Sequence, residues 1–148
     1  MSPEQTIQPP IERLPLPVLI QHLPQELLIY RQWVGWRYVS RDAHRKPDKQ
    51  PVNPRTLGNA GVKWPNTWSR VEDAYLAYQE HGLSGIGFVL TADDPFVGVD
   101  IDNCLDQETI SPFADEVVAR LASYTEVSPS GTGLRILLAC PEYRDNRR

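Results

Sequence analysis

This chain of 148 residues has no long apolar run, only two cysteines and no basic segment at its N-terminus. No apolar run approaches the roughly 20 residues that a membrane-spanning helix needs, so we expect no contact with a membrane. The two cysteines, Cys104 and Cys140, lie far apart, which predicts neither a disulfide framework nor a zinc site. The N-terminus is acidic and proline-rich, unlike a signal peptide. Together these absences favour a cytoplasmic protein.

The composition that remains is that of an ordinary globular domain. Hydrophobic residues make up 41% and charged residues 23% of the chain, which is long enough to bury a core. The net charge of −4 is unevenly spread, because residues 31–63 carry +6 and residues 64–148 carry −8. This asymmetry indicates either a polyanion bound to one surface and metal ions to another, or two solvated surfaces that merely differ. Charge alone leaves both interpretations open.

Proline divides the chain into a leader and a domain. Six prolines fall within the first 24 residues, which predicts an extended and poorly ordered leader over residues 1–23. A single domain over residues 24–148 should follow it.

Hydrophobic periodicity and capping residues predict three helices in that domain. The first is short and starts with Pro24 in its first turn. The second covers residues 69–82, where Ser69 and Glu72 fit a capping box and Gly82 ends the helix. The third covers residues 111–124, with Ser111 as N-cap followed by a proline.

Apolar and β-branched runs predict the strands, which lie at residues 32–40, 50–54, 85–90, 96–102, 125–128 and 134–140. We expect an α+β (mixed α/β) domain with a single central β-sheet and helices packed on a face. The adjacent runs GIGFVL and VGVDI should form the centre of that sheet.

Asp100 and Asp102 are the first candidate site. Side chains two apart on a strand share a face, so the two carboxylates should lie side by side at the C-terminal end of a central strand. Paired carboxylates can hold Mg²⁺ or Mn²⁺, and two such ions can clamp the reacting oxygens of a phosphoryl transfer. The alternative is a polar strand end with solvated acids, and D-x-D alone does not decide between the two readings.

The loop SPSGTG and the strand after it are the second candidate. Ser128, Ser130 and Thr132 supply hydroxyls, while Gly131 and Gly133 allow close backbone approach to phosphate oxygens. Arg135 follows on the strand and can bind a phosphate through two hydrogen bonds. The alternative is a Ser/Gly hairpin turn followed by an ordinary strand arginine, and the loop alone favours this alternative.

A basic stretch over residues 41–55 is the third candidate, because with the preceding tryptophans it could hold a nucleic-acid backbone or a triphosphate. Its cationic residues are Arg41, Arg45, Lys46, Lys49 and Arg55. Taken alone, the stretch favours a solvated hairpin tip, and His44 within it favours an exposed histidine over a ligand.

Five stretches in this order resemble the N-terminal domain of phage- and plasmid-type DNA primase-polymerases, within the archaeo-eukaryotic primase superfamily. They are QWVGWRY, KPDKQPVNPRT, NTWSRVEDA, GIGFVLTADDPFVGVDIDNCLD and SYTEVSPSGTGLRIL, covering roughly residues 24–140. The stretches VGVDIDNCLD and YTEVSPSGTGL at this spacing are the specific part.

The resemblance implies a fold, a reaction and a set of roles. The fold would be the family's core, related to an RNA-recognition-like sheet. Asp100 and Asp102 would be the metal-binding catalytic carboxylates, and the segment 128–135 would bind the phosphates of an NTP or dNTP. A 3′-hydroxyl would attack the α-phosphate with two Mg²⁺ or Mn²⁺ ions, on a single-stranded DNA template lying along basic surface. A helicase domain or protein is an implied partner.

Two departures from the family's pattern set the alternatives. Arg135 stands where the second motif commonly ends in histidine, and arginine cannot act as an acid or base near neutral pH. The third motif is an acidic residue on a strand after the second motif, and it has no match here. Glu142 and Asp145 are the only acids after Arg135, and neither lies in an apolar run that predicts a strand. We therefore expect a domain truncated at its C-terminus, or a relative that binds nucleotide or single-stranded DNA without turnover. A different Mg²⁺-dependent phosphotransferase or nuclease is the third reading.

Overall fold

The computed structural model describes residues 15–142, so the predicted disorder of residues 1–14 and the carboxylate of Asp145 lie outside the described part. Residues 15–23, which we expected to belong to the leader, contain a 3₁₀ turn at Ile20–His22. Ile20 and Leu23 pack against the hydrophobic core. The folded part therefore begins before the expected boundary at residue 24.

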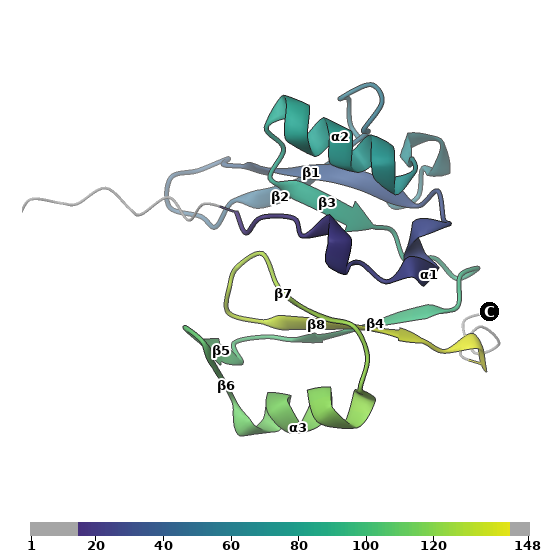
Figure 1. The fold of residues 1–148 in the computed structure, drawn as a ribbon. Helices are drawn as coiled ribbons and strands as arrows, with labels where there is room; N and C mark the ends of the chain where they lie inside the picture. Colours follow the sequence, from purple (N-terminus) through teal and green to yellow (C-terminus); the bar gives the residue numbers. More distant parts are fainter. Residues whose placement is uncertain (1–14, 143–148) are drawn as a thin grey trace, which may run out of the picture.

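The first half of the described chain forms an antiparallel sheet with a helix on it (Figure 1). After α1 (Gln25–Leu28), strand β1 (Trp33–Val39) pairs with β2 (Asp48–Val52) on one side and β3 (Gly85–Phe88) on the other. Residues 40–47 form the tip of the β1–β2 hairpin, so the first part of the basic stretch 41–55 lies in the predicted hairpin tip, while Asp48–Val52 forms β2. A 3₁₀ turn (Pro65–Thr67) and helix α2 (Val71–His81) separate β2 from β3.

The second half forms another antiparallel sheet, in the order β4-β8-β7. Its strands are β4 (Phe96–Ile101), β8 (Leu134–Ala139) and β7 (Thr125–Val127). A small hairpin of β5 (Leu105–Asp106) and β6 (Thr109–Ile110), which the sequence did not predict, leads into α3 (Pro112–Leu121). In Figure 1 both three-stranded sheets lie between α2 and α3.

The α+β class is confirmed, but the expected single central sheet is wrong. Strands β3 and β4 belong to different sheets, and each has only one strand partner in the described chain. The chain changes sheet at Asp94, whose side chain is 1% exposed. Its carboxylate accepts hydrogen bonds from the backbone N–H groups of Thr91 and Phe96 and from Gln32 Nε2, which fixes the turn between the strands. An apolar run predicts a buried strand, but it does not choose the partner.

Some helix ends agree with the sequence, but Pro24 is the N-cap of α1 and not part of its first turn, and α3 ends at Leu121, before the expected residue 124. Gly82 ends α2 in the left-handed region at φ 61°, and Ser111 Oγ caps α3 by accepting from Ala114 N at 3.3 Å, with Pro112 in the first turn. The capping box is wrong, because Arg70 is the N-cap of α2. Ser69 is fully buried, and its hydroxyl donates to backbone carbonyls of Trp33 and Arg70 instead.

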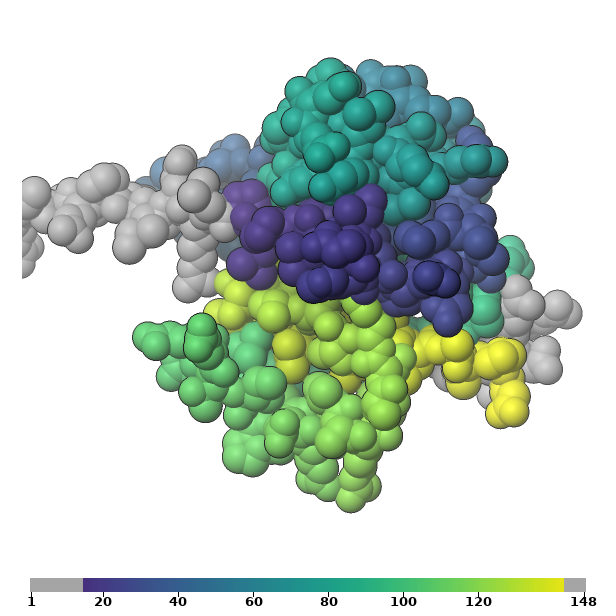
Figure 2. Space-filling model, viewed as in Figure 1, coloured from purple at the N-terminus to yellow at the C-terminus, as the bar shows by residue number. Residues whose placement is uncertain are grey.

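Hydrophobic contacts join the two sheets. The main cluster brings together Leu27, Trp33, Val71, Ala74 and Phe96, with Leu137 of β8 packed against it. A second cluster of Cys104, Ala114 and Leu134 fixes α3 to the other face of the second sheet. On the face shown in Figure 2, the purple residues around α1 fill the space between α2 and the yellow-green second sheet. In the described part of the chain, no helix has the length and apolarity to cross a membrane.

Candidate functional site

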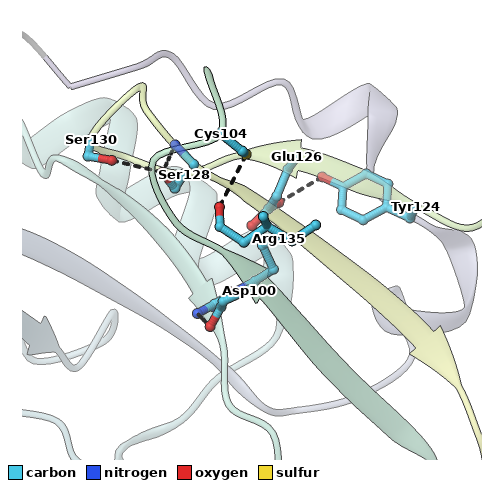
Figure 3. Close-up of polar contacts among 9 residues, drawn as sticks. Asp100, Cys104, Tyr124, Glu126, Ser128, Ser130 and Arg135 are labelled. Carbon is cyan, nitrogen blue, oxygen red and sulfur yellow. Dashed lines mark hydrogen bonds and ion pairs between the residues drawn. The ribbon is translucent and has the colours of Figure 1, made fainter. Parts of the chain in front are cut away.

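Asp100 and Arg135 form an ion pair across two neighbouring strands. The register of β4 and β8 places the two residues opposite each other. Arg135 donates from Nε to Asp100 Oδ1 at 2.7 Å and from a terminal nitrogen to Oδ2 at 3.1 Å (Figure 3). Both carboxylate oxygens are engaged, although the side chains are about half exposed, at 55% for Asp100 and 48% for Arg135.

The ion pair shifts the pKa values of Asp100 and Arg135, and the charges of the pair also act on the pKa of Lys49. The hydrogen bond from Arg135 is the main cause that lowers the pKa of Asp100, with burial opposing it. The same bond raises the pKa of Arg135, and the charge of Glu126 adds to the rise. Lys49 of β2 has a lowered pKa, chiefly because it is partly buried and also because Lys46 and Arg135 repel it. Lys49, which lies in the first sheet, therefore interacts electrostatically with the Asp100–Arg135 pair.

Asp102 does not lie on the strand. Strand β4 ends at Ile101, and the chain turns through Asp102 and Asn103, which has φ 51°. The alternation that should place Asp100 and Asp102 on one face therefore does not apply, because Asp102 lies in a turn. Asp102 is exposed and stands beside Gly133, whose ideal Cβ would lie 3.6 Å from the Asp102 Cα.

The Ser/Gly loop forms a closed turn in which three hydroxyl groups are linked one to the next by hydrogen bonds. Ser128 Oγ lies 2.9 Å from Ser130 Oγ, which lies 2.9 Å from Thr132 Oγ1. The backbone N–H of Gly133 donates to Ser128 Oγ at 3.1 Å, and Gly131 takes φ 75° at the tip. The loop therefore presents a row of hydroxyl groups on a turn that needs glycine.

The acidic strand end and the Ser/Gly loop are held together by their backbones. The carbonyl of Thr132 accepts from the N–H groups of both Cys104 and Leu105, at 2.9 and 3.0 Å. A Cβ on Gly133 would lie 2.8 Å from the carbonyl oxygen of Ile101, so only glycine fits. Two motifs about 30 residues apart thus form one site.

The first sheet adds an aromatic and cationic surface. Tyr38 and Lys49 are opposite each other in the β1–β2 register, and Lys49 Nζ lies 5.8 Å from the centroid of the Trp36 ring. The Tyr38 hydroxyl donates to the carbonyl of Pro129 at 3.4 Å, which links this surface to the Ser/Gly loop. Gly85 leaves room for the Trp36 ring, since a Cβ there would lie 2.6 Å from the Trp36 Nε1.

The other basic candidates have different surroundings. Arg45 and Lys46 are exposed at the tip of the hairpin, and Arg41 pairs with Asp48 at 3.0 Å on its surface. Arg55 donates to the backbone carbonyls of Asn66 at 3.1 Å and Trp68 at 3.5 Å, which fastens the loop before α2. Lys49 lies near the Asp100–Arg135 pair, because the charge of Arg135 lowers its pKa and that of Asp100 raises it.

Sequence reasoning missed Glu126 and Tyr124. Glu126 of β7 is opposite Arg135 in the β7–β8 register, so it extends the row that begins at Asp100. The Tyr124 hydroxyl donates to Glu126 Oε2 at 2.9 Å (Figure 3). The alternation in YTEVS would have placed Tyr124 and Glu126 on one face, but only the strand order shows which face.

The donor chemistry suits a hard divalent ion only in part. Asp100 and Asp102 offer carboxylate oxygens, which Mg²⁺ and Mn²⁺ prefer, and phosphates of a bound nucleotide commonly complete such sites. Within residues 15–142, no group of three or more His, Cys, Asp and Glu residues is placed to hold a metal. Asp100 is also engaged by Arg135. These residues therefore fit an ion that arrives with a nucleotide better than an ion bound by protein alone.

Comparison with known proteins confirms the resemblance seen in the sequence: the chain is homologous to part of a phage DNA primase-polymerase. A DNA primase-polymerase of Nitratiruptor phage NrS-1 is 35% identical to it over 131 residues, which cover 84% of this chain. The matched part is 17% of that protein's length, so the chain spans about a sixth of this relative. No family model matches the chain.

Proposed function

We propose that this domain is the nucleotidyltransferase part of a DNA primase-polymerase that replicates a phage, plasmid or integrated element. It transfers a nucleotide from an NTP or dNTP to a 3′-hydroxyl on a single-stranded DNA template and releases pyrophosphate. The observation that carries the proposal is the backbone contact between Gly133 and Ile101, which joins the acidic end of β4 to the Ser/Gly loop. The homology to the phage enzyme supports it.

Each residue of the site has a proposed role. Asp100 and Asp102 hold Mg²⁺ or Mn²⁺, which when bound neutralises charge on the reacting phosphate and favours the ionised hydroxyl. The hydroxyls and N–H groups of Ser128, Ser130, Gly131, Thr132 and Gly133 bind phosphate oxygens. Arg135 binds a phosphate through its planar guanidinium.

The template strand lies along the β1–β2 hairpin. Lys49 and the exposed cations Arg41, Arg45 and Lys46 neutralise its phosphates, while Trp36 offers an aromatic surface next to the site. Arg55 supports this surface from its loop, because its guanidinium donates to two backbone carbonyls.

A second candidate is a domain that binds nucleotide or single-stranded DNA without turnover. The observation that favours it is the complete engagement of the Asp100 carboxylate by Arg135. A carboxylate that stays paired with arginine binds a metal ion less well, so this second candidate predicts nucleotide or DNA binding with no incorporation.

Primer extension on a single-stranded template separates the two. The chain is incubated with dNTPs and Mg²⁺ or Mn²⁺, and Asp100→Ala is compared with Asp93→Ala, an exposed acid in the turn between the sheets. Extension by wild type and Asp93→Ala, but not by Asp100→Ala, is the expected result. Nucleotide binding without extension in any variant supports the second candidate, and cleavage of nucleic acid without nucleotide points to a nuclease.

A further inference from the structure

Three charged side chains form one row across the second sheet. Asp100, Arg135 and Glu126 are register partners on β4, β8 and β7, in that spatial order. Side chains directly opposite on neighbouring strands share a face and lie close together. Arg135 therefore lies between two acidic residues in this row, of which the proposed function uses only Asp100.

The Arg135 guanidinium and a metal ion compete for the carboxylate of Asp100. Arg135 engages both carboxylate oxygens, at 2.7 and 3.1 Å. A divalent ion at Asp100 would use at least one of those oxygens, and two cations so close would repel each other in a partly buried site. Movement of Arg135 away from Asp100 would therefore favour metal binding at that carboxylate.

Glu126 is the acceptor that the fold places on the other side of Arg135. Its carboxylate is half-buried and is fixed by the Tyr124 hydroxyl, which donates to Oε2 at 2.9 Å. Glu126 is the register partner of Arg135 on the neighbouring strand β7, so the two side chains lie on the same face of the sheet. A guanidinium has more N–H donors than Asp100 uses, which allows it to engage a second carboxylate.

We propose that Glu126 is a positioning residue that holds the Arg135 guanidinium when Asp100 binds a divalent ion. Without Glu126, the guanidinium would return to Asp100 and compete with the ion. The inference rests on the proposed function, because it needs a metal ion at Asp100. It assigns a role to a carboxylate that the sequence reading left without one.

Binding of Mn²⁺ tests the proposal without measuring activity. Free Mn²⁺ is followed by electron paramagnetic resonance while it is titrated into the full chain, with and without a deoxynucleoside triphosphate analogue carrying an α,β-imido group. The variants are Glu126→Gln, Arg135→Gln and the double variant. Glu116→Gln is the matched control, because Glu116 also pairs with an arginine, Arg120 at 2.7 Å, on a helix at the opposite face of the sheet.

Glu126→Gln should weaken Mn²⁺ binding in the presence of the analogue by about threefold to tenfold, the scale of coupling between charged neighbours. Arg135→Gln should tighten Mn²⁺ binding without nucleotide. In the Arg135→Gln background the Glu126→Gln change should have almost no effect, because Glu126 acts through Arg135. Tyr124→Phe, which removes only the hydroxyl, should act as Glu126→Gln does but more weakly.

Three results would overturn the inference. If Glu126→Gln weakens Mn²⁺ binding equally with and without Arg135, Glu126 contacts the ion directly or acts through the fold. If Glu126→Gln changes nothing, or changes no more than Glu116→Gln, Glu126 does not position Arg135. If wild type itself binds no Mn²⁺ in the presence of the analogue, the proposed function fails and the inference fails with it.

Discussion

The backbone of Gly133 lies so close to Ile101 that a Cβ on Gly133 would be 2.8 Å from the Ile101 carbonyl oxygen. Ile101 is the last residue of β4 and directly precedes Asp102, while Gly133 directly precedes β8. This contact fixes the distance between the acidic strand end and the phosphate-binding loop proposed for the site.

Gly133→Ala should therefore lower the free energy of unfolding by about 1–3 kcal/mol, the usual cost of an overpacked position, and should weaken nucleotide binding. Gly82→Ala is the control, because Gly82 has φ 61° with no atom near its ideal Cβ and lies at the end of α2. Its cost should be about 1 kcal/mol of backbone strain, with nucleotide binding unchanged. Urea denaturation and nucleotide titration measure both effects. Equal binding losses in the two variants would contradict the assignment of the loop.

Lys49 and Arg55 should respond differently to removal of charge. Lys49→Ala should weaken the binding of single-stranded DNA and lower the salt dependence of that binding by about one counterion. The reason is that Lys49 lies beside Trp36 and interacts electrostatically with Asp100 and Arg135. Arg55→Ala should instead lower stability, because two backbone carbonyls lose their donor. Fluorescence anisotropy of labelled DNA at several salt concentrations, with thermal melting, measures both. A larger change in salt dependence for Arg55→Ala would reverse this ranking.

The Asp100–Arg135 pair should stabilise the fold only where Asp100 is ionised. The pKa of Asp100 is lower in the folded chain, so the pair's contribution is present above the ordinary aspartate pKa of about 3.9 and is lost as pH falls through the folded value. Both side chains are about half exposed, so the contribution at neutral pH should be at most about 1 kcal/mol. Urea denaturation of wild type and Arg135→Gln from pH 7 to pH 2.5 checks this. A difference in stability that persists at the lowest pH would show that the pair is not its source.

Tyr124 should make the fold sensitive to alkali. Burial, followed by the charge of Glu126 and the hydrogen bond to it, raises the pKa of the Tyr124 hydroxyl. The folded chain keeps this proton above pH 10, where an unfolded chain releases it, so the free energy of unfolding should fall as pH rises beyond 10. Tyr124→Phe should remove this part of the dependence. Stability measured between pH 8 and pH 11 tests it, and Tyr78→Phe is a control on α2. Parallel curves for wild type and Tyr124→Phe would refute the prediction.

Local signals in the sequence predicted much of the fold. Ser111, Pro112 and Gly82 mark helix ends through interactions within a few residues, and all three lie where the sequence placed them. Ser69 shows the limit of such signals, because its hydroxyl bonds to Trp33, which lies 36 residues away. A capping residue can be recognised locally, but a competing partner from a distant strand cannot.

The candidate site shows the same division. The residue types in FVGVDID and SPSGTGLR determined which side chains could meet a metal ion or a phosphate, and these residues lie together in the structure. Only the tertiary structure decided that β4 pairs with β8, because an apolar strand carries no record of its partner. That pairing puts Arg135 on Asp100, and the pairing of β7 with β8 adds Glu126 on the other side. The sequence of a strand determines which of its side chains share a face. The residues opposite them on neighbouring strands depend on the strand order and register of the folded sheet.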